Sequence, residues 1–160
     1  MVADINIKSN VIDISNYIKS IEVAMPNAIQ QSLARVSAFG VKQITDKTQS
    51  GKTPDGGRFI PYSKQYKQSK EFKKKTNKFV DLTLSGNMFR SLTFKATRTR
   101  GTLFFRRQTE DIKAFKHDTG VGKLPVRPFF AIGRRDEDKI RKLFLDHLSK
   151  GVKIWAKERV

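Results

Sequence analysis

The sequence predicts an α+β protein, in which a small antiparallel sheet accompanies a long N-terminal amphipathic helix and a C-terminal helix, with extended loops or arms. Three patterns predict this class: helical apolar spacing over residues 26–47, strand-like alternation on both sides of Gly101, and a second helical pattern over residues 134–150. The chain has 160 residues, of which 38% are hydrophobic. That composition suffices for a core, so we predict a single domain over residues 1–160.

The first fifty residues are predicted to form an arm and then the longest helix. Apolar and polar residues alternate over residues 4–9, which is typical of a short strand or arm, so we expect an arm over residues 1–12. Pro26 favours a helix start, because proline at the first helical position lacks a donor that would have no partner there anyway. The helix predicted over residues 26–47 carries one apolar stripe: Ile29, Leu33, Val36, Gly40 and Ile44.

The next segment is predicted to be a loop followed by a polar helix. Residues 49–58 contain Pro-Asp-Gly-Gly, and these residue types favour tight turns. The spacing from Gly51 to Gly56 matches the ends of a phosphate-binding loop, but no Lys-Ser/Thr follows, so we reject that motif. We expect a helix over residues 63–75, with Ser63 as its N-cap and lysines at its C-terminal end.

A short helix and a hairpin are predicted in the middle of the chain. Thr83 and Ser85 are alternative N-caps for the short helix. It carries three apolar residues inward: Met88, Phe89 and Leu92. Residues 92–100 and 102–107 alternate around Gly101, which predicts a two-stranded hairpin with a glycine-containing turn. The alternation places two arginines on one face of this hairpin: Arg98 and Arg100.

The last third is predicted to be mostly helical. Residues 115–120 are typical of the end of a short helix that its final glycine stops, and residues 125–133 hold two prolines that favour an extended backbone. A helix is expected over residues 134–150, with acidic side chains in its first turn. Gly151 is expected to end or bend that helix and to leave residues 151–160 as a C-terminal tail or strand.

Composition excludes several functional classes. The chain has no cysteine and two histidines, so we expect no disulfide, no thiolate metal site and no cofactor. His117 stands beside Asp118, but sequence neighbours rarely face each other, and we expect capping or surface hydrogen bonding there instead of acid–base catalysis. No apolar run reaches the ~18 residues of a membrane span, and the N-terminus lacks the apolar stretch of a signal peptide. We expect a soluble protein, intracellular when made, that is not an enzyme.

Positive charge is concentrated in the middle of the chain. The formal net charge is +18, and residues 51–110 hold 15 basic against 4 acidic side chains. Such a segment favours a polyanion, and DNA contacts made by it would ignore sequence, because base-reading side chains are not evident. The alternative is an ordinary solvated surface. The candidate DNA-facing residues are Lys73, Lys74, Lys75, Lys78, Arg98, Arg100, Arg106 and Arg107.

Four landmarks in a fixed order resemble the virion-morphogenesis and tail-completion family of tailed bacteriophages. A long N-terminal helix comes first. Residues 54–63 then give Pro-Asp-Gly-Gly-Arg-Phe-Ile-Pro-Tyr-Ser, and residues 82–92 give Leu-Thr-Leu-Ser-Gly-Asn-Met-Phe-Arg-Ser-Leu. Residues 127–133, Arg-Pro-Phe-Phe-Ala-Ile-Gly, precede the C-terminal helix. The ordered set covers about residues 26–150, although Phe59 stands where the family usually has tryptophan.

The resemblance implies a non-enzymatic component of the virion at the head–tail junction, assembled in the cytoplasm of the bacterial host. It implies a homo-oligomeric ring, six-fold in preference to twelve-fold, around packaged DNA. Its expected neighbours are the connector, head-closure and tail-terminator or tail-tube proteins, with no membrane partner.

The candidate subunit-interface residues are Arg127, Pro128, Phe129, Phe130 and Trp155. The alternative for Phe129 and Phe130 is that they fill the core of one subunit. Two other classes stay open at this point. One is a sequence-nonspecific nucleic-acid-binding protein outside any virion, and the other is a toxin-like nuclease, for which clustered carboxylates or a histidine base would be needed.

Overall fold

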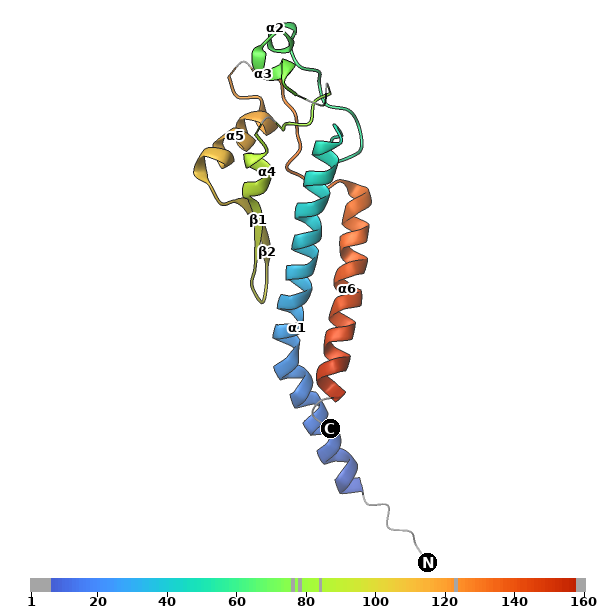
Figure 1. Cartoon of the computed structure of the whole chain (residues 1–160). Helices are drawn as coiled ribbons and strands as arrows, with labels where there is room; N and C mark the ends of the chain where they lie inside the picture. Colours follow the sequence, from blue (N-terminus) through green and yellow to red (C-terminus); the bar gives the residue numbers. More distant parts are fainter. Residues whose placement is uncertain (1–6, 76, 78, 84, 123, 158–160) are drawn as a thin grey trace, which may run out of the picture.

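The computed structural model describes residues 7–75, 77, 79–83, 85–122 and 124–157. Its elements are, in chain order, α1 (Ile7–Gln49), α2 (Lys64–Lys67), α3 (Lys70–Lys73), α4 (Asn87–Ser91), β1 (Leu92–Ala96), β2 (Gly101–Phe105), α5 (Gln108–Thr119) and α6 (Arg134–Lys157). The predicted α+β class is confirmed. Helices α1 and α6 lie side by side in opposite directions, the hairpin packs along the other side of α1, and α2 to α5 gather at one end (Figure 1). We call that end the head.

Helix α1 begins far earlier than its sequence pattern predicts. It starts at Ile7, so the strand alternative for residues 4–9 is wrong from Ile7 onward, and residues 7–12 of the predicted arm are helical. Residues 1–6 lie outside the described part of the chain. Pro26 lies inside the helix instead of starting it. Proline in a helix interior removes one hydrogen bond and costs about 3 kcal/mol. Ala24 and Ala28 on either side of it are 3% and 1% exposed, so tertiary packing sustains the helix through the proline.

The apolar stripe of α1 is confirmed only in part, because the helix is covered on two sides. Val36 and Ile44 are buried, whereas Leu33 is half-buried. Small and hydroxyl-bearing residues also lie inside, including Ser32 and Thr48, which are each 1% exposed. Their hydroxyls donate to the carbonyls of the preceding turn, at 2.8 Å and 2.7 Å, so no polar group is left without a partner at these positions.

Helix α6 continues past the glycine that was expected to stop it. The helix runs through Gly151 to Lys157, so the tail predicted over residues 151–160 is helical as far as it is described. A Cβ atom at Gly151 would lie 3.1 Å from the Cβ of Ala28 on α1. The glycine therefore permits a close approach of two helices. A sequence pattern alone cannot distinguish such a glycine from one that ends a helix.

The predicted hairpin is confirmed, although its arginines are not where alternation placed them. The antiparallel register pairs Leu92 with Phe105 and Ala96 with Gly101. Arg98 and Arg100 lie in the turn beyond the last pair, so they do not share a strand face. Thr97 holds this turn: its amide donates to the carbonyl of Arg100 at 2.8 Å, and its hydroxyl accepts from the amide of Arg100 at 3.1 Å.

The helix predicted over residues 63–75 is divided into two. Ser63 caps α2 as expected, accepting from the amide of Tyr66 at 3.1 Å. Ser69 then caps α3 by accepting from the amide of Phe72 at 3.1 Å. A serine inside a helical pattern can start a new helix because its hydroxyl competes for backbone amides.

Helix α4 also differs from its prediction at the N-cap. Its N-cap is Gly86, in the left-handed region at φ 72°, and not Thr83 or Ser85. Met88, Phe89 and Leu92 are buried as expected. Gly120 ends α5 at φ 73°, which confirms the predicted stop.

The main core lies where the head meets α1 and the hairpin. Phe129 is its most buried aromatic residue at 1% exposed, and its ring meets that of Phe89 edge-on at 6.0 Å. The cluster consists of Ile44, Phe59, Val80, Leu82, Met88, Phe89, Leu92, Phe105, Ala114 and Phe129. Residues between Ile44 and Phe129 therefore fix the position of the head on α1.

An ion pair joins the end of α1 to the start of α6. Asp136 is 2% exposed and pairs with Lys47 and, at 3.3 Å, with Lys139. Burial alone would raise the pKa of Asp136, but hydrogen bonds and charge from Lys47 and Lys139 together outweigh it and lower the pKa below its ordinary value. The carboxylate therefore contributes stability above its unfolded-state pKa of about 4, and this contribution is lost as pH falls through the lower folded-state value.

Replacing Asp136 with asparagine should lower the free energy of unfolding at neutral pH by roughly 1–3 kcal/mol, because Lys47 would lose its anion. The difference from wild type should shrink below about pH 4, as the wild-type carboxyl becomes protonated. Urea unfolding measured across this pH range checks both statements. Asp138→Asn is the matched control, since Asp138 is exposed in the same turn; an equal effect of both variants would contradict the assignment.

Candidate functional site

The residues predicted to face DNA lie in three separate places. Lys73 and Lys74 are exposed at the end of α3 in the head, and Arg98 and Arg100 are exposed at the tip of the hairpin, away from the head (Figure 1). Two further arginines, Arg106 and Arg107, are exposed where β2 leads into α5. A five-residue strand, about 17 Å long, separates them from the tip. Lys78 lies outside the described residues.

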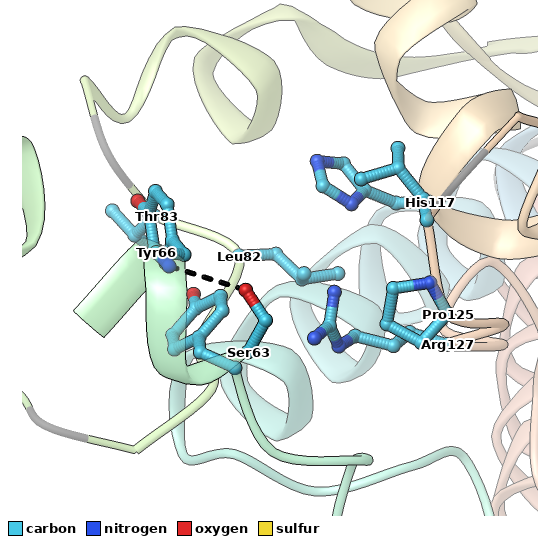
Figure 2. A pocket seen from close by; sticks show the side chains of 9 residues that line it. Ser63, Tyr66, Leu82, Thr83, His117, Pro125 and Arg127 are labelled. Carbon is cyan, nitrogen blue, oxygen red and sulfur yellow. Dashed lines mark hydrogen bonds between the residues drawn. The ribbon is translucent and has the colours of Figure 1, made fainter. Parts of the chain in front are cut away.

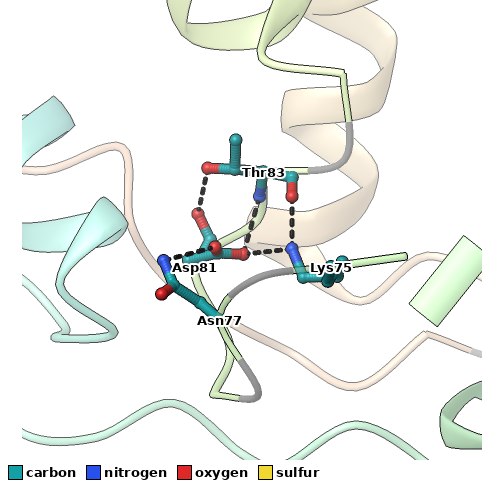
Figure 3. Close-up of polar contacts among 4 residues, drawn as sticks. All are labelled: Lys75, Asn77, Asp81 and Thr83. Atoms are coloured by element: carbon teal, nitrogen blue, oxygen red, sulfur yellow. Dashed lines mark hydrogen bonds and ion pairs between the residues drawn. The ribbon is translucent and has the colours of Figure 1, made fainter. Parts of the chain in front are cut away.

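Lys75 does not fit the prediction, because it is buried. Its ammonium lies 2.6 Å from the carboxylate of Asp81, and the two side chains are 5% and 6% exposed. Figure 3 shows the surrounding network: Lys75 also donates to the carbonyl of Thr83, and Asp81 accepts from the amide of Thr83 at 3.0 Å and from Asn77 at 3.5 Å. This lysine organises the segment between α3 and α4, and we withdraw it from the candidate DNA-facing set.

The predicted interface strip is divided between the core and the surface. Arg127 is 3% exposed, and its guanidinium donates to the carbonyls of Ile60 at 2.9 Å and Pro61 at 3.2 Å. Phe129 fills the core, as the alternative reading held, so neither Arg127 nor Phe129 is available on the surface of the subunit. Pro128 and Phe130 are exposed and remain interface candidates. Trp155 lies in α6, and its side chain is outside the described part of the structure.

Asp118 and His117 do not form an acid–base pair. The carboxylate of Asp118 accepts from the amides of Phe129 and Phe130, at 2.8 Å and 3.0 Å, and so holds the extended segment against α5. The His117 side chain is partly buried, and its Nδ1 has no hydrogen-bond partner among the described residues. The hydrogen bonding expected of His117 is therefore not found at Nδ1, and this side chain lines a cavity. Asp118 instead binds backbone amides of another segment.

That cavity lies in the head and has mostly apolar walls. It measures about 330 Å³ and is shown in Figure 2, where the side chains of Leu82, His117 and Arg127 surround it. Burial, and next the charge of Arg127, lower the pKa of His117, so the imidazole is neutral at neutral pH. Burial, and next the charge of Asp81, raise the pKa of Tyr62 to about 12, so its hydroxyl keeps its proton. The lining therefore presents one fixed cation, Arg127, beside a neutral imidazole and a protonated phenol.

A surface that sequence reasoning missed is apolar, not basic. Helix α5 buries Glu110 and Ala114 while it exposes Ile112 and Phe115, which are 47% and 58% exposed. Neighbouring segments add further exposed apolar side chains: Phe104, Val121, Leu124, Val126 and Phe130. We call these seven residues the α5 surface. The i, i+3 spacing of Ile112 and Phe115 was visible in the sequence, but periodicity shows only that two residues share a face. It does not show which face points inward.

The described residues hold no candidate metal site and no candidate membrane span. No three His, Cys, Asp or Glu side chains of that part of the chain gather in a way that could hold a metal ion. None of its helices combines the length and hydropathy that a membrane span requires.

Replacing Lys75 with methionine should destabilise the protein by about 3 kcal/mol, because it leaves the Asp81 carboxylate buried without its cation. Lys73→Met removes the same charge from an exposed position and should change the free energy of unfolding by less than about 0.5 kcal/mol. Chemical denaturation of the two variants beside wild type makes the comparison. Equal stability of both variants would contradict the buried ion pair and make Lys75 a candidate DNA-facing residue again.

Comparison with known proteins places this architecture in a family. A family model described as the phage virion morphogenesis family matches residues 24–149, from the middle of α1 to the last third of α6. The match includes the hairpin, the head and the ion pair between the two long helices. No curated protein and no solved structure matched the chain. Because the match covers well over half of the sequence, the chain belongs to the phage virion morphogenesis family, and its role is associated with the phage virion.

Proposed function

We propose that this protein is a structural subunit of the head–tail junction, which forms a ring around the DNA channel and joins the head connector to the tail. Family membership supports a role in structure or assembly. The observation that carries the finer proposal is the α5 surface. A chain with a formal charge of +18 exposes seven large apolar side chains between residues 104 and 130. Large exposed apolar patches on soluble proteins are typical of contacts with other proteins.

The α5 surface packs on the core through its inner side. The ring of Phe130 lies 5.2 Å from that of Phe105, and Asp118 fixes the backbone of the same segment. Helix α5 packs on α4 and on β2. A surface that is rigid before assembly loses little conformational entropy when it binds, which favours a stable contact.

A ring of six copies needs contacts between different patches of neighbouring copies, because a contact between identical patches closes after two copies. The α5 surface supplies one patch, and we assign the other to a different face of the next copy. Six copies are proposed, with twelve as the alternative. Repetition of exposed cations around the axis would add their fields at the packaged DNA that passes through. The remaining proposed partners are the connector, head-closure and tail-terminator or tail-tube proteins, and no catalytic step is part of the role.

Purified protein should have a mass of about six times the 18.3-kDa protomer in light scattering, at low and at high salt, because apolar contacts are not screened. Phe115→Asp should shift the mass to that of the protomer, since a charge would be buried in the contact. Leu145→Asp is the control: Leu145 is 56% exposed on α6, outside the α5 surface, and its variant should remain oligomeric.

The virion role has its own test. A phage that lacks this chain should accumulate filled heads and separate tails, visible by electron microscopy, and wild-type protein supplied in trans should restore joining where Phe115→Asp does not. Joined particles formed without the chain would overturn the proposal. A protein that stays monomeric at every salt concentration and binds nucleic acid tightly would instead favour the non-virion binding role.

A further inference from the structure

A groove with cationic walls runs along one side of the α1–α6 pair. Two cavities, of about 730 Å³ and 590 Å³, adjoin each other because Lys139 lines both of them. The first lies where α1 ends and α6 begins, and the second lies farther from the head, between the two helices. Together they are lined by seven basic residues, Arg35, Lys42, Lys47, Lys52, Arg134, Arg135 and Lys139. We call this the seam groove.

Most of these cations remain available to a ligand. Arg35, Lys52, Arg134 and Arg135 are exposed and have no ion-pair partner among the described residues. Three acidic residues share the lining: Asp46, Asp55 and Asp136. Asp136 is occupied with Lys47 and Lys139 inside the structure.

Lys42 pairs with Asp46 at 2.7 Å, but the two side chains are 68% and 53% exposed. Such a pair contributes little, so a phosphate could replace the carboxylate. The lining therefore keeps a surplus of positive charge after its internal pairs are formed.

The groove has the length that a nucleic-acid backbone requires. From Arg35 to its end at Gln49, α1 rises about 21 Å, which matches about six phosphates along one strand of a duplex. Ala38, Phe39 and Leu143 add an apolar part to the lining of the second cavity. A concave surface that combines charged and low-dielectric lining focuses its field on the ligand, whereas Arg98 and Arg100 lie exposed in a turn.

We infer that the seam groove binds the phosphate backbone of duplex DNA without regard to sequence, and that it does so in preference to the arginines of the hairpin. The inference rests on the proposed function in one respect: it takes packaged duplex DNA as the ligand. Phosphate contacts by lysine and arginine carry no base information, and the lining holds no asparagine or glutamine to read bases.

The test compares two triple variants that each remove three positive charges from exposed positions. The groove variant is K52Q/R134Q/R135Q, and the matched hairpin variant is R98Q/R100Q/R107Q. Binding of a short, fluorescently labelled duplex of random sequence is measured by anisotropy over a range of salt concentrations. The groove variant should reduce the slope of log K against log salt by roughly 3 and weaken binding at low salt at least tenfold. The hairpin variant should change that slope by less than about 1.

A second measurement uses the unmodified chain, so it does not depend on the variants folding. Duplex DNA should protect Lys42 and Lys52 from acylation, detected by mass spectrometry, and leave Lys73 and Lys95 reactive. Equal losses in both triple variants, a larger loss in the hairpin variant, absence of DNA binding by wild type, or protection of Lys73 and Lys95 instead would each overturn the inference.

Light scattering of the same samples separates the two proposals. A groove variant that keeps the wild-type mass and loses DNA binding supports the groove and leaves the ring intact. A groove variant with the wild-type mass and unchanged DNA binding overturns the groove alone. If the wild-type protein is monomeric and the groove variant loses DNA binding, the ring alone is overturned.

Discussion

The antiparallel pairing of α1 with α6 is the constraint on which the rest of this structure depends. Two contacts at opposite ends set it. Near the head, the buried carboxylate of Asp136 joins the first turn of α6 to Lys47 in the last turns of α1. Far from the head, Gly151 lets α6 approach Ala28 closely. The hydrogen bond within the Lys47–Asp136 ion pair is directional and the glycine contact is steric, so together they restrain both the register and the separation of the helices.

Once α6 covers one side of α1, the other side is left for the hairpin and the head. Gly101 lies directly over α1, where a Cβ atom would come within 2.2 Å of the Ser37 hydroxyl. The loops of the head are then tied together by two buried cations, Lys75 and Arg127, which bind carbonyls and a carboxylate from segments close and distant in sequence. Some of the chain's positive charge therefore serves folding, and the net charge overstates what is available to a partner.

The surface that remains carries both apolar and cationic side chains. Seven of the exposed large apolar side chains lie on α5 and the segments next to it, and cations line the seam groove and the hairpin tip. A protein that assembles around a polyanion needs both kinds of surface, since apolar contacts hold copies together at any salt concentration and cations act on DNA through a field that salt screens. The presence of both kinds of surface gives the proposed virion role a physical basis.

Local patterns in the sequence determined the class of fold, the hairpin, the Ser63 cap and the stop at Gly120, because each depends on residues within a few positions of one another. The ordered motifs also indicated the family before any contact was known. Only the tertiary structure decided the length of the two long helices. Burial of Ala24 and Ala28 outweighs the cost of Pro26 inside α1, and Gly151 serves a close contact between the helices and does not end α6. It also decided which charges are usable: a lysine in a basic run looks the same in sequence whether its partner is water, DNA or, as for Lys75, a buried aspartate six residues on.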